Sequence, residues 1–301
     1  MGVNNAHHHG AEHNRAFAIG VVLNLGFVAV EAAFGVVAGS LALLADAGHN
    51  LGDVLGLLLA WGATYLARLR PTRRRTYGWR SSTILAALVN AAILLVAVGG
   101  IASEGVRRLY EPARVAGKTV MLVAAVGIVI NAATALLFRP RRKHDVNIRG
   151  AFLHLAGDAA VSAGVVVAGV GMLATDWQWL DPIVSLIIAV VLLVGSWRLL
   201  RDSVNLALHA VPEGIDPEQV RRYLCGLPGV MAVHDLHIWA MSTTETALTV
   251  HLVKPNPEAD DAVISRATEE LRELFGIQHT TMQWERENHS GPCPNCCDGL
   301  G

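Results

Sequence analysis

Two short stretches of the chain carry a histidine followed four residues later by an aspartate. ADAGHNLGD contains His49 and Asp53, and HLAGD contains His154 and Asp158. Residues four apart lie on one face of an α-helix, one turn above the other. Two such faces turned toward each other offer two imidazoles and two carboxylates, which is a four-ligand set for one divalent metal ion.

This ligand set favours a transition metal. Nitrogen and oxygen ligands in fourfold coordination suit Zn²⁺ best, and they also suit Cd²⁺ and Co²⁺. Mg²⁺ and Ca²⁺ prefer more oxygen ligands. Asp46 lies one turn before His49. We interpret Asp46 either as an auxiliary ligand or as a group that supports the ligands or the path to them.

Both histidine–aspartate pairs lie inside long apolar segments. Of the 301 residues, 52% are hydrophobic and only 16% are charged, whereas a soluble domain carries about 25% charged residues. Crossing a membrane takes about 20 apolar residues. Six segments reach that length, which predicts an α-helical membrane protein with six transmembrane helices: Phe17–Val37, Leu41–Leu66, Thr83–Ala102, Thr119–Phe138, Ala151–Ala174 and Pro182–Leu200.

Ionisable side chains within such segments indicate function, because each costs about 2.5–3.5 kcal/mol to insert. Glu31 lies near the outer end of the first segment, where it either extends to the interface or lines an entrance. Helix starts are also visible. Ser40 is a predicted N-cap of the second span, and Asp181, just before Pro182, is a predicted N-cap of the sixth.

The distribution of arginine and lysine predicts the orientation. Basic residues crowd the connections after the second and fourth spans, 67–82 and 139–150, while the turns at 39–40 and 176–181 have none. The connection after the third span is basic as well and departs from this bias. By the positive-inside rule, both termini are cytoplasmic.

After residue 208 the composition becomes that of a soluble domain. A helix is predicted from Asp216–Pro217 to about Gly226. Strands are predicted at Val230–Ala240 and Thr246–Val253, then a helix at Asp260–Phe275 and a strand at His279–Glu285. The order α-β-β-α-β makes an α/β domain. The predicted divisions are a His-rich tail at 1–16, the membrane domain at 17–208, the α/β domain at 209–287 and a Cys-containing tail at 288–301.

The α/β domain carries a second candidate metal site. His234 and His251 lie on the strands that flank the turn 242–245, nearly opposite one another and on the same face. Glu285 closes the third strand. Strict alternation places His237 and Trp239 on the other face of the sheet.

Both tails hold further candidate ligands. Cys293 and Cys296 have the two-residue spacing of a thiolate metal site. A cluster of histidines near the N-terminus is a candidate for ion capture; its members are His7, His8 and His9.

The chain resembles the cation diffusion facilitator transporters. The likeness rests on LLADAGHNLGD, HLAGDAAVS, six spans and HDLHIWAM in the C-terminal domain, and it runs from about Phe17 to Glu285. It implies a homodimer that exports Zn²⁺ and related ions against H⁺, with a metallochaperone-like cytoplasmic domain. It also implies that the two histidine–aspartate pairs are the transport ligands and that His234, His251 and Glu285 bind regulatory Zn²⁺. His279 lies one residue off the family register and is an auxiliary ligand candidate.

The chemistry of the ligands agrees with antiport. Imidazole binds metal only when neutral and carboxylate only when ionised, so metal and protons compete for the same groups. The alternatives are a proton-coupled exporter of an organic cation and a membrane metal sensor that transports nothing. We see no nucleophile elbow or phosphate loop and expect no enzyme. The near-neutral net charge of −1 gives no indication of nucleic-acid binding, and the expected partners are metal ions, protons and membrane lipid.

Overall fold

The computed structural model describes residues 25–138, 146–256 and 260–286, and within 146–155 it describes the backbone alone. The chain divides into two compact units. The first comprises the residues up to Leu58 together with Val89–Arg198. The second comprises Leu59–Leu88 and the residues from Leu199 onward. The expected boundary at 208–209 stays a prediction.

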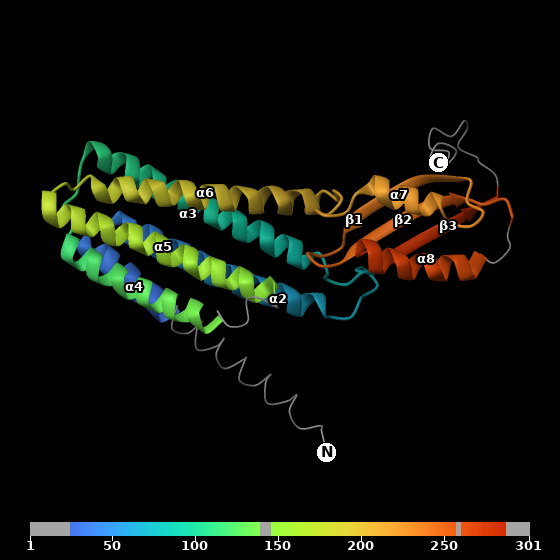
Figure 1. Ribbon diagram of the computed structural model, residues 1–301, viewed down its shortest axis with the longest axis horizontal. Coiled ribbons are helices and arrows are strands. Elements are labelled where there is room, and N and C mark those ends of the chain that lie inside the picture. The colour runs from blue at the N-terminus through green and yellow to red at the C-terminus, as the bar shows by residue number, and fades with distance from the viewer. Residues whose placement is uncertain (1–24, 139–145, 257–259, 287–301) are drawn as a thin grey trace, which may run out of the picture. The chain divides into compact units, whose positions relative to one another are not determined.

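Over the residues that the structure describes, each of the six predicted spans falls on a helix (Figure 1). The first is described over Leu25–Ala38. The others are α2 (Leu41–Ala67), α3 (Ser82–Tyr110), α4 (Gly117–Phe138), α5 (Val146–Thr175) and α6 (Leu180–Ala207).

Four of the described helices are long and apolar enough to cross a membrane, namely α3, α4, α5 and α6. Leu25–Ala38 is a shorter apolar helix, and residues 17–24 lie outside the described part. The sequence of α2 contains Asp46, His49, Asn50 and Asp53, and these polar residues lower its hydropathy. The polar residues that predict a metal site in α2 thus also make this helix harder to recognise as a membrane span from its hydropathy.

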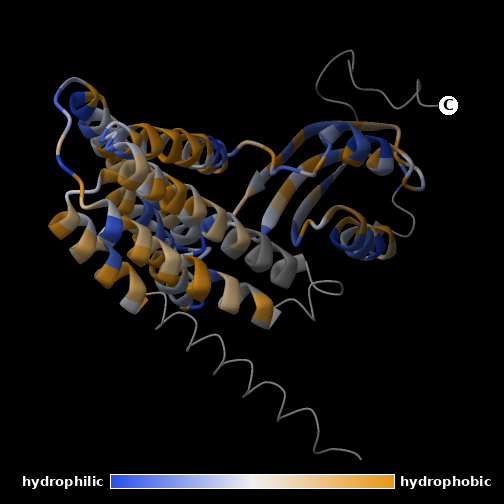
Figure 2. Cartoon of the chain, turned by 60° about the vertical axis from the view of Figure 1, so that its left-hand side comes forward, coloured by the Kyte–Doolittle hydropathy of each residue, from blue (hydrophilic) through white to orange (hydrophobic). Residues whose placement is uncertain are grey.

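The first unit buries one apolar core and exposes another apolar surface. Phe27, Leu43, Val120, Val165 and Ile188 come from five different helices and pack together. Large apolar residues also point outward, and valines of α3, α5 and α6 are among them: Val96 is 77% exposed, Val167 71% and Val194 67%. Figure 2 shows how many of the residues along these helices are hydrophobic. Outward apolar side chains are expected of helices whose solvent is lipid.

The start of α2 is capped from two directions. Ser40 Oγ accepts a hydrogen bond from the backbone N–H of Leu43 at 3.2 Å, as predicted for an N-cap. Asp181 is not the N-cap of the sixth span, because α6 begins one residue earlier. Its carboxylate instead accepts bonds from the N–H groups of Leu41 and Ala42 and from the Ser40 hydroxyl. Asp181 therefore joins the N-terminal end of α6 to that of α2.

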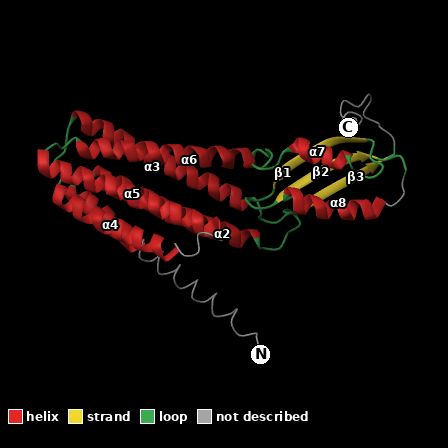
Figure 3. Cartoon of the chain, viewed as in Figure 1, coloured by secondary structure: helices red, strands yellow, loops and turns green. Residues whose placement is uncertain are grey.

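The C-terminal domain has the predicted element order (Figure 3). Helix α7 (Pro217–Cys225) begins after Asp216, whose carboxylate accepts a bond from Glu218 N at 2.9 Å. Strands β1 (Ala232–Ala240) and β2 (Thr246–Val253) pair antiparallel, and helix α8 (Asp260–Phe275) leads to β3 (His279–Glu285), which pairs parallel with β2. The sheet order is β1-β2-β3.

Both helices of this domain cover the same face of the sheet. Val220 of α7 and Leu271 of α8 share one buried core with Leu248, Val250 and Leu252 of β2. Because side chains alternate along a strand, Thr249 and His251 lie on the opposite face.

A β-bulge in β1 corrects one prediction. His234 pairs with His251 and His237 with Thr249, so three steps along β1 match two along β2. Asp235, inside the bulge, has a φ of 53°. An extra residue in one strand resets the alternation of side chains. His237 and Trp239 therefore lie on the same face as His234, and the prediction of the opposite face was wrong.

Candidate metal centres

The first compact unit brings together three of the four predicted transport ligands. His49 Nε2 lies 3.3 Å from Asp158 Oδ1, and His49 Nδ1 lies 3.7 Å from Asp53 Oδ2. One ligand atom from each residue falls within 4.8 Å of the others. The side chain of Asp158 is 4% exposed, that of His49 18% and that of Asp53 33%. A buried carboxylate, an imidazole and a partly accessible carboxylate face one point between α2 and α5.

The fourth predicted ligand, His154, lies on α5 one turn before Asp158. Its side chain lies outside the described part of the structure. Its ligation stays a prediction, which the helical spacing supports.

Small residues let α2 pack closely beside its neighbours. Ala45 and Ala47 are buried. A Cβ atom on Gly52 would lie 2.3 Å from Leu94 Cδ2 of α3, so a larger residue there would require the Leu94 side chain to shift. Close packing of small residues is common between membrane helices. It holds the helix face that carries His49 and Asp53 in place.

Asp46 lies outside this group of three ligand candidates. Its side chain is fully buried, and its Oδ2 accepts a hydrogen bond from Ser162 Oγ at 2.8 Å. Ser162 lies one turn after Asp158 on α5. The contacts Asp46–Ser162 and His49–Asp158 thus join α2 and α5 at two successive helical turns.

The sheet carries the second predicted group. His234 Nε2 lies 2.9 Å from Glu285 Oε2, and His251 Nδ1 lies 2.8 Å from Glu285 Oε1. The two imidazole rings meet edge to face with centroids 5.2 Å apart. The strand register explains the arrangement, because His251 is opposite His234 on β1 and Val253 is beside Glu285 on β3. All three residues belong to one potential metal group.

The Glu285 carboxyl is held in its charged form. Burial by itself raises its pKa, but the hydrogen bonds and the positive charge of His234 and His251 outweigh burial, so the pKa lies below its usual range. An ionised carboxylate beside two imidazoles is a ready ligand set for a transition metal.

Comparison with known proteins identifies the family. Residues 17–206 match the family model of the cation efflux transmembrane domain, and residues 212–287 match that of the cation efflux protein cytoplasmic domain. The chain belongs to the cation efflux family. It is therefore an integral, multi-pass membrane protein.

Curated relatives of this cation efflux protein match over most of their length. The zinc transporter ZitB of Escherichia coli is 36% identical, over 94% of this chain and 90% of that protein. The cadmium, cobalt and zinc/H⁺-K⁺ antiporter of Bacillus subtilis is 33% identical over 94% and 92%. The metal cation efflux system protein CzcD of Cupriavidus metallidurans is 33% identical over 95% and 90%.

Solved structures match as well. Among them is the metal-bound C-terminal domain of the CzcD transporter of C. metallidurans, which is 33% identical and covers 24% of this chain and 99% of its own, with a TM-score of 0.22.

His279 lies outside the metal group of His234, His251 and Glu285 in the C-terminal domain. Its Nε2 lies 2.8 Å from Arg80 Nη1, and the same guanidinium nitrogen lies 2.6 Å from Glu245 Oε2. The ring also meets Tyr77 edge-on. His279 Nε2 thus faces the Arg80 guanidinium, and His279 does not belong to the potential metal group. The other auxiliary candidates, Cys293, Cys296 and His7–His9, lie outside the described residues.

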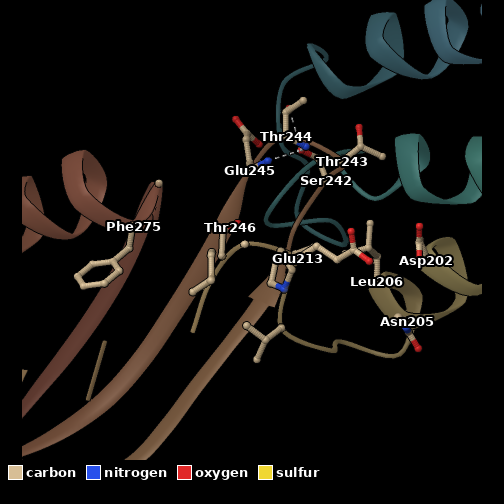
Figure 4. Close-up of a pocket in the computed structure, with 16 residues that line it drawn as sticks. Asp202, Asn205, Leu206, Glu213, Ser242, Thr243, Thr244, Glu245, Thr246 and Phe275 are labelled. Atoms are coloured by element: carbon tan, nitrogen blue, oxygen red, sulfur yellow. Dashed lines mark hydrogen bonds between the residues drawn. The ribbon is translucent and has the colours of Figure 1, made fainter. Parts of the chain in front are cut away.

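The second unit also contains a pocket of about 490 Å³ between the end of α6 and the β1–β2 turn (Figure 4). Asp202, Glu213 and Glu245 lie around it. Ser242 Oγ accepts bonds from the N–H groups of Thr244 and Glu245 and so shapes the turn. None of the lining residues is a predicted ligand.

Glu31 is the functional candidate that sequence reasoning placed wrongly. It neither extends to the interface nor lines an open entrance, because its side chain is fully buried. Asn50 Nδ2 donates to Glu31 Oε2 at 3.4 Å. The signal in the sequence was an acidic residue within an apolar span. Its position near the end of the span wrongly suggested an exposed side chain.

Proposed function

We propose that this cation efflux protein exports Zn²⁺ from the cytoplasm in exchange for protons. The observation that carries the proposal is the convergence of His49, Asp53 and Asp158 between two membrane helices. The curated relatives support it, since they are named for the transport of zinc, cadmium and cobalt. In this proposal Zn²⁺ is the cargo and His154 supplies the fourth ligand.

Exchange follows from the protonation chemistry of the ligands. Zn²⁺ requires the neutral imidazole of His49 and the carboxylates of Asp53 and Asp158, so binding displaces protons. When the site opens to a more acidic outer side, protons re-enter the same groups and displace the ion. Alternation between the two openings then couples metal exit to proton entry.

The cytoplasmic group has a regulatory role in this proposal. His234, His251 and Glu285 bind an ion on the open face of the sheet, with both termini in the cytoplasm and two chains forming a homodimer. Zn²⁺ at this site biases the transporter toward one state, which changes the rate of export.

The test is zinc flux in proteoliposomes that contain the purified full-length protein and a zinc-sensitive dye. Zinc should accumulate inside vesicles with an acidic interior and much less at equal pH. Flux equal to that of empty liposomes would contradict transport and leave a membrane sensor. Transport of an organic cation with no zinc flux would favour an exporter of such cations.

A further inference from the structure

Two acidic side chains of the membrane unit are fully buried outside the group of metal ligands. Glu31 lies on the helix Leu25–Ala38 and Asp46 on α2, and both are 0% exposed. Asn50, which donates to Glu31, lies one turn after Asp46 on α2, so the two carboxyl groups lie on the same side of that helix and face each other. Proximity of two acids is unfavourable when both are ionised, and burial makes it more so.

The partners of the pair account for two of its four oxygens. Ser162 Oγ donates to Asp46 Oδ2 at 2.8 Å, and Asn50 Nδ2 donates to Glu31 Oε2 at 3.4 Å. The remaining oxygens, Glu31 Oε1 and Asp46 Oδ1, are buried and have no donor. A hydrogen bond between two carboxyl groups needs a proton on one of them. A proton on one of the two carboxyl groups supplies the missing hydrogen-bond donor.

The pair lies one turn from the candidate transport site. Asp46 precedes His49 by three residues on α2, and its partner Ser162 follows Asp158 by four residues on α5. Among the described residues, the titratable groups that act on Asp46 besides Glu31 are His49 and Asp158. A divalent cation held by these ligands adds positive charge about one helical turn away, roughly 5 Å. That charge favours two ionised carboxylates over a protonated pair.

We propose that Glu31 and Asp46 form a proton-binding site, distinct from the metal ligands, that releases its proton when a divalent cation occupies His49, Asp53 and Asp158. The inference rests on the proposed antiport. On release the O–H bond breaks, the proton passes to water on the side to which the site is open, and both carboxylates remain as anions beside the bound cation. Proton return to the pair favours release of the cation.

The experiment counts protons released per zinc bound. Zinc chloride is added to purified full-length protein in weakly buffered detergent solution that contains a pH indicator. Glu31→Gln keeps the size of the side chain, and its amide N–H replaces the carboxyl proton as donor to Asp46. The variant should release about one proton fewer per zinc than the wild type. Zinc binding at His234, His251 and Glu285 releases the same number of protons from both proteins, so these protons cancel from the difference.

Glu104→Gln is the matched control. Glu104 lies on α3 of the same unit and accepts bonds from Arg107 and Arg108 at 2.7 and 2.8 Å, so its carboxylate needs no proton as a donor. This variant should release as many protons as the wild type. An unchanged count in Glu31→Gln would overturn the proposal. Fewer zinc ions bound by Glu31→Gln would overturn it as well, because Glu31 would then be a metal ligand.

A measurement on the wild type keeps the test decisive if Glu31→Gln does not fold. Infrared difference spectra should show that zinc removes the carbonyl band of a protonated carboxylic acid, and persistence of the band would overturn the proposal. The proposed function fails separately, by absence of zinc flux in proteoliposomes. Zinc flux with an unchanged proton count in Glu31→Gln would leave antiport intact and reject only this site.

Discussion

His49 Nε2 on α2 lies 3.3 Å from Asp158 Oδ1 on α5, although the two residues are 109 positions apart in the chain. The contact joins the two histidine–aspartate segments that the sequence singles out. Asp53 completes the group at 3.7 Å from the other ring nitrogen. The imidazole thus has a carboxylate at each of its nitrogens.

Removal of either carboxylate should abolish transport. Asp53→Ala or Asp158→Ala deletes one metal ligand, whereas even partners that only orient ligands are worth about 10–100-fold in metal affinity. We expect zinc flux below about 1% of wild type, from protein that still inserts and elutes normally. Glu111→Ala, at an exposed residue on the connection after α3, is the control and should keep full flux. Wild-type flux from Asp158→Ala would contradict the site.

The identity of the ligand at position 49 should set the ion preference. His49→Asp exchanges an imidazole nitrogen for carboxylate oxygens, which favour harder ions. Transport should persist, with the harder ion Mn²⁺ gaining relative to Zn²⁺. Competition between ions in a proteoliposome assay measures the ranking. A ranking identical to the wild type would remove His49 from the ligands.

The sequence predicts the elements well because their signals are local. Span length marks the membrane helices, and strand alternation marks β2 and β3, whose bounds match the prediction. The pairing of His234 with His251 does not follow from the turn alone, because the register set by Ala240 and Thr246 would place His234 opposite Leu252, and the bulge shifts it to His251.

Three features depend on tertiary structure and escape such reasoning. The bulge at Asp235 turns His237 to the same face as His234, and alternation cannot anticipate an extra residue in a strand. Asp181 caps α2 instead of its own helix. Glu31 is buried because Asn50 and Asp46 come from another helix to meet it. The partners of Asp181 and Glu31 lie on other helices, and the bulge changes how β1 pairs with β2.

Glu285 should make the stability of the cytoplasmic domain depend on acid pH. Its pKa is lowered in the folded protein, because the bonds from His234 and His251 outweigh burial. A group with a lowered pKa contributes stability above its ordinary value, near 4.3, and loses it as the pH falls through the lowered value. In metal-free full-length protein, Glu285→Gln should therefore destabilise the domain near neutral pH and lose this effect in acid.

Hydrogen exchange of the β2 amides, followed against pH, measures this difference. Glu273→Gln, at an exposed residue of α8, is the control and should follow the wild type. A difference between Glu285→Gln and wild type that grows as the pH falls would have the wrong sign.

Transport should depend on an inward proton gradient. In inside-out vesicles with an acidic interior, zinc uptake should fall to the level of equal pH once an ionophore dissipates the gradient. The reason is that protons must return to the ligands before the ion leaves. A time course of dye fluorescence before and after ionophore addition measures the effect. Uptake that continues unchanged would rule out antiport.

The last prediction concerns the C-terminal tail, where Cys293 follows Glu285 by eight residues. Thiolates at Cys293 and Cys296 have the spacing of a metal pair, and so short a connection keeps them near the strand that carries Glu285. Cys293→Ser with Cys296→Ser should lower the number of ions bound per subunit and change the zinc dependence of flux without abolishing it.

The measurement is zinc stoichiometry by equilibrium dialysis under reducing conditions, which keep the cysteines as thiols that can ligate the ion. Cys297→Ser is the matched control, because it removes a neighbouring thiol and leaves the two-residue spacing of Cys293 and Cys296. It should bind as many ions as the wild type. Equal stoichiometry in the double variant and the wild type would show that the tail holds no metal. Regulation would then rest on His234, His251 and Glu285 alone.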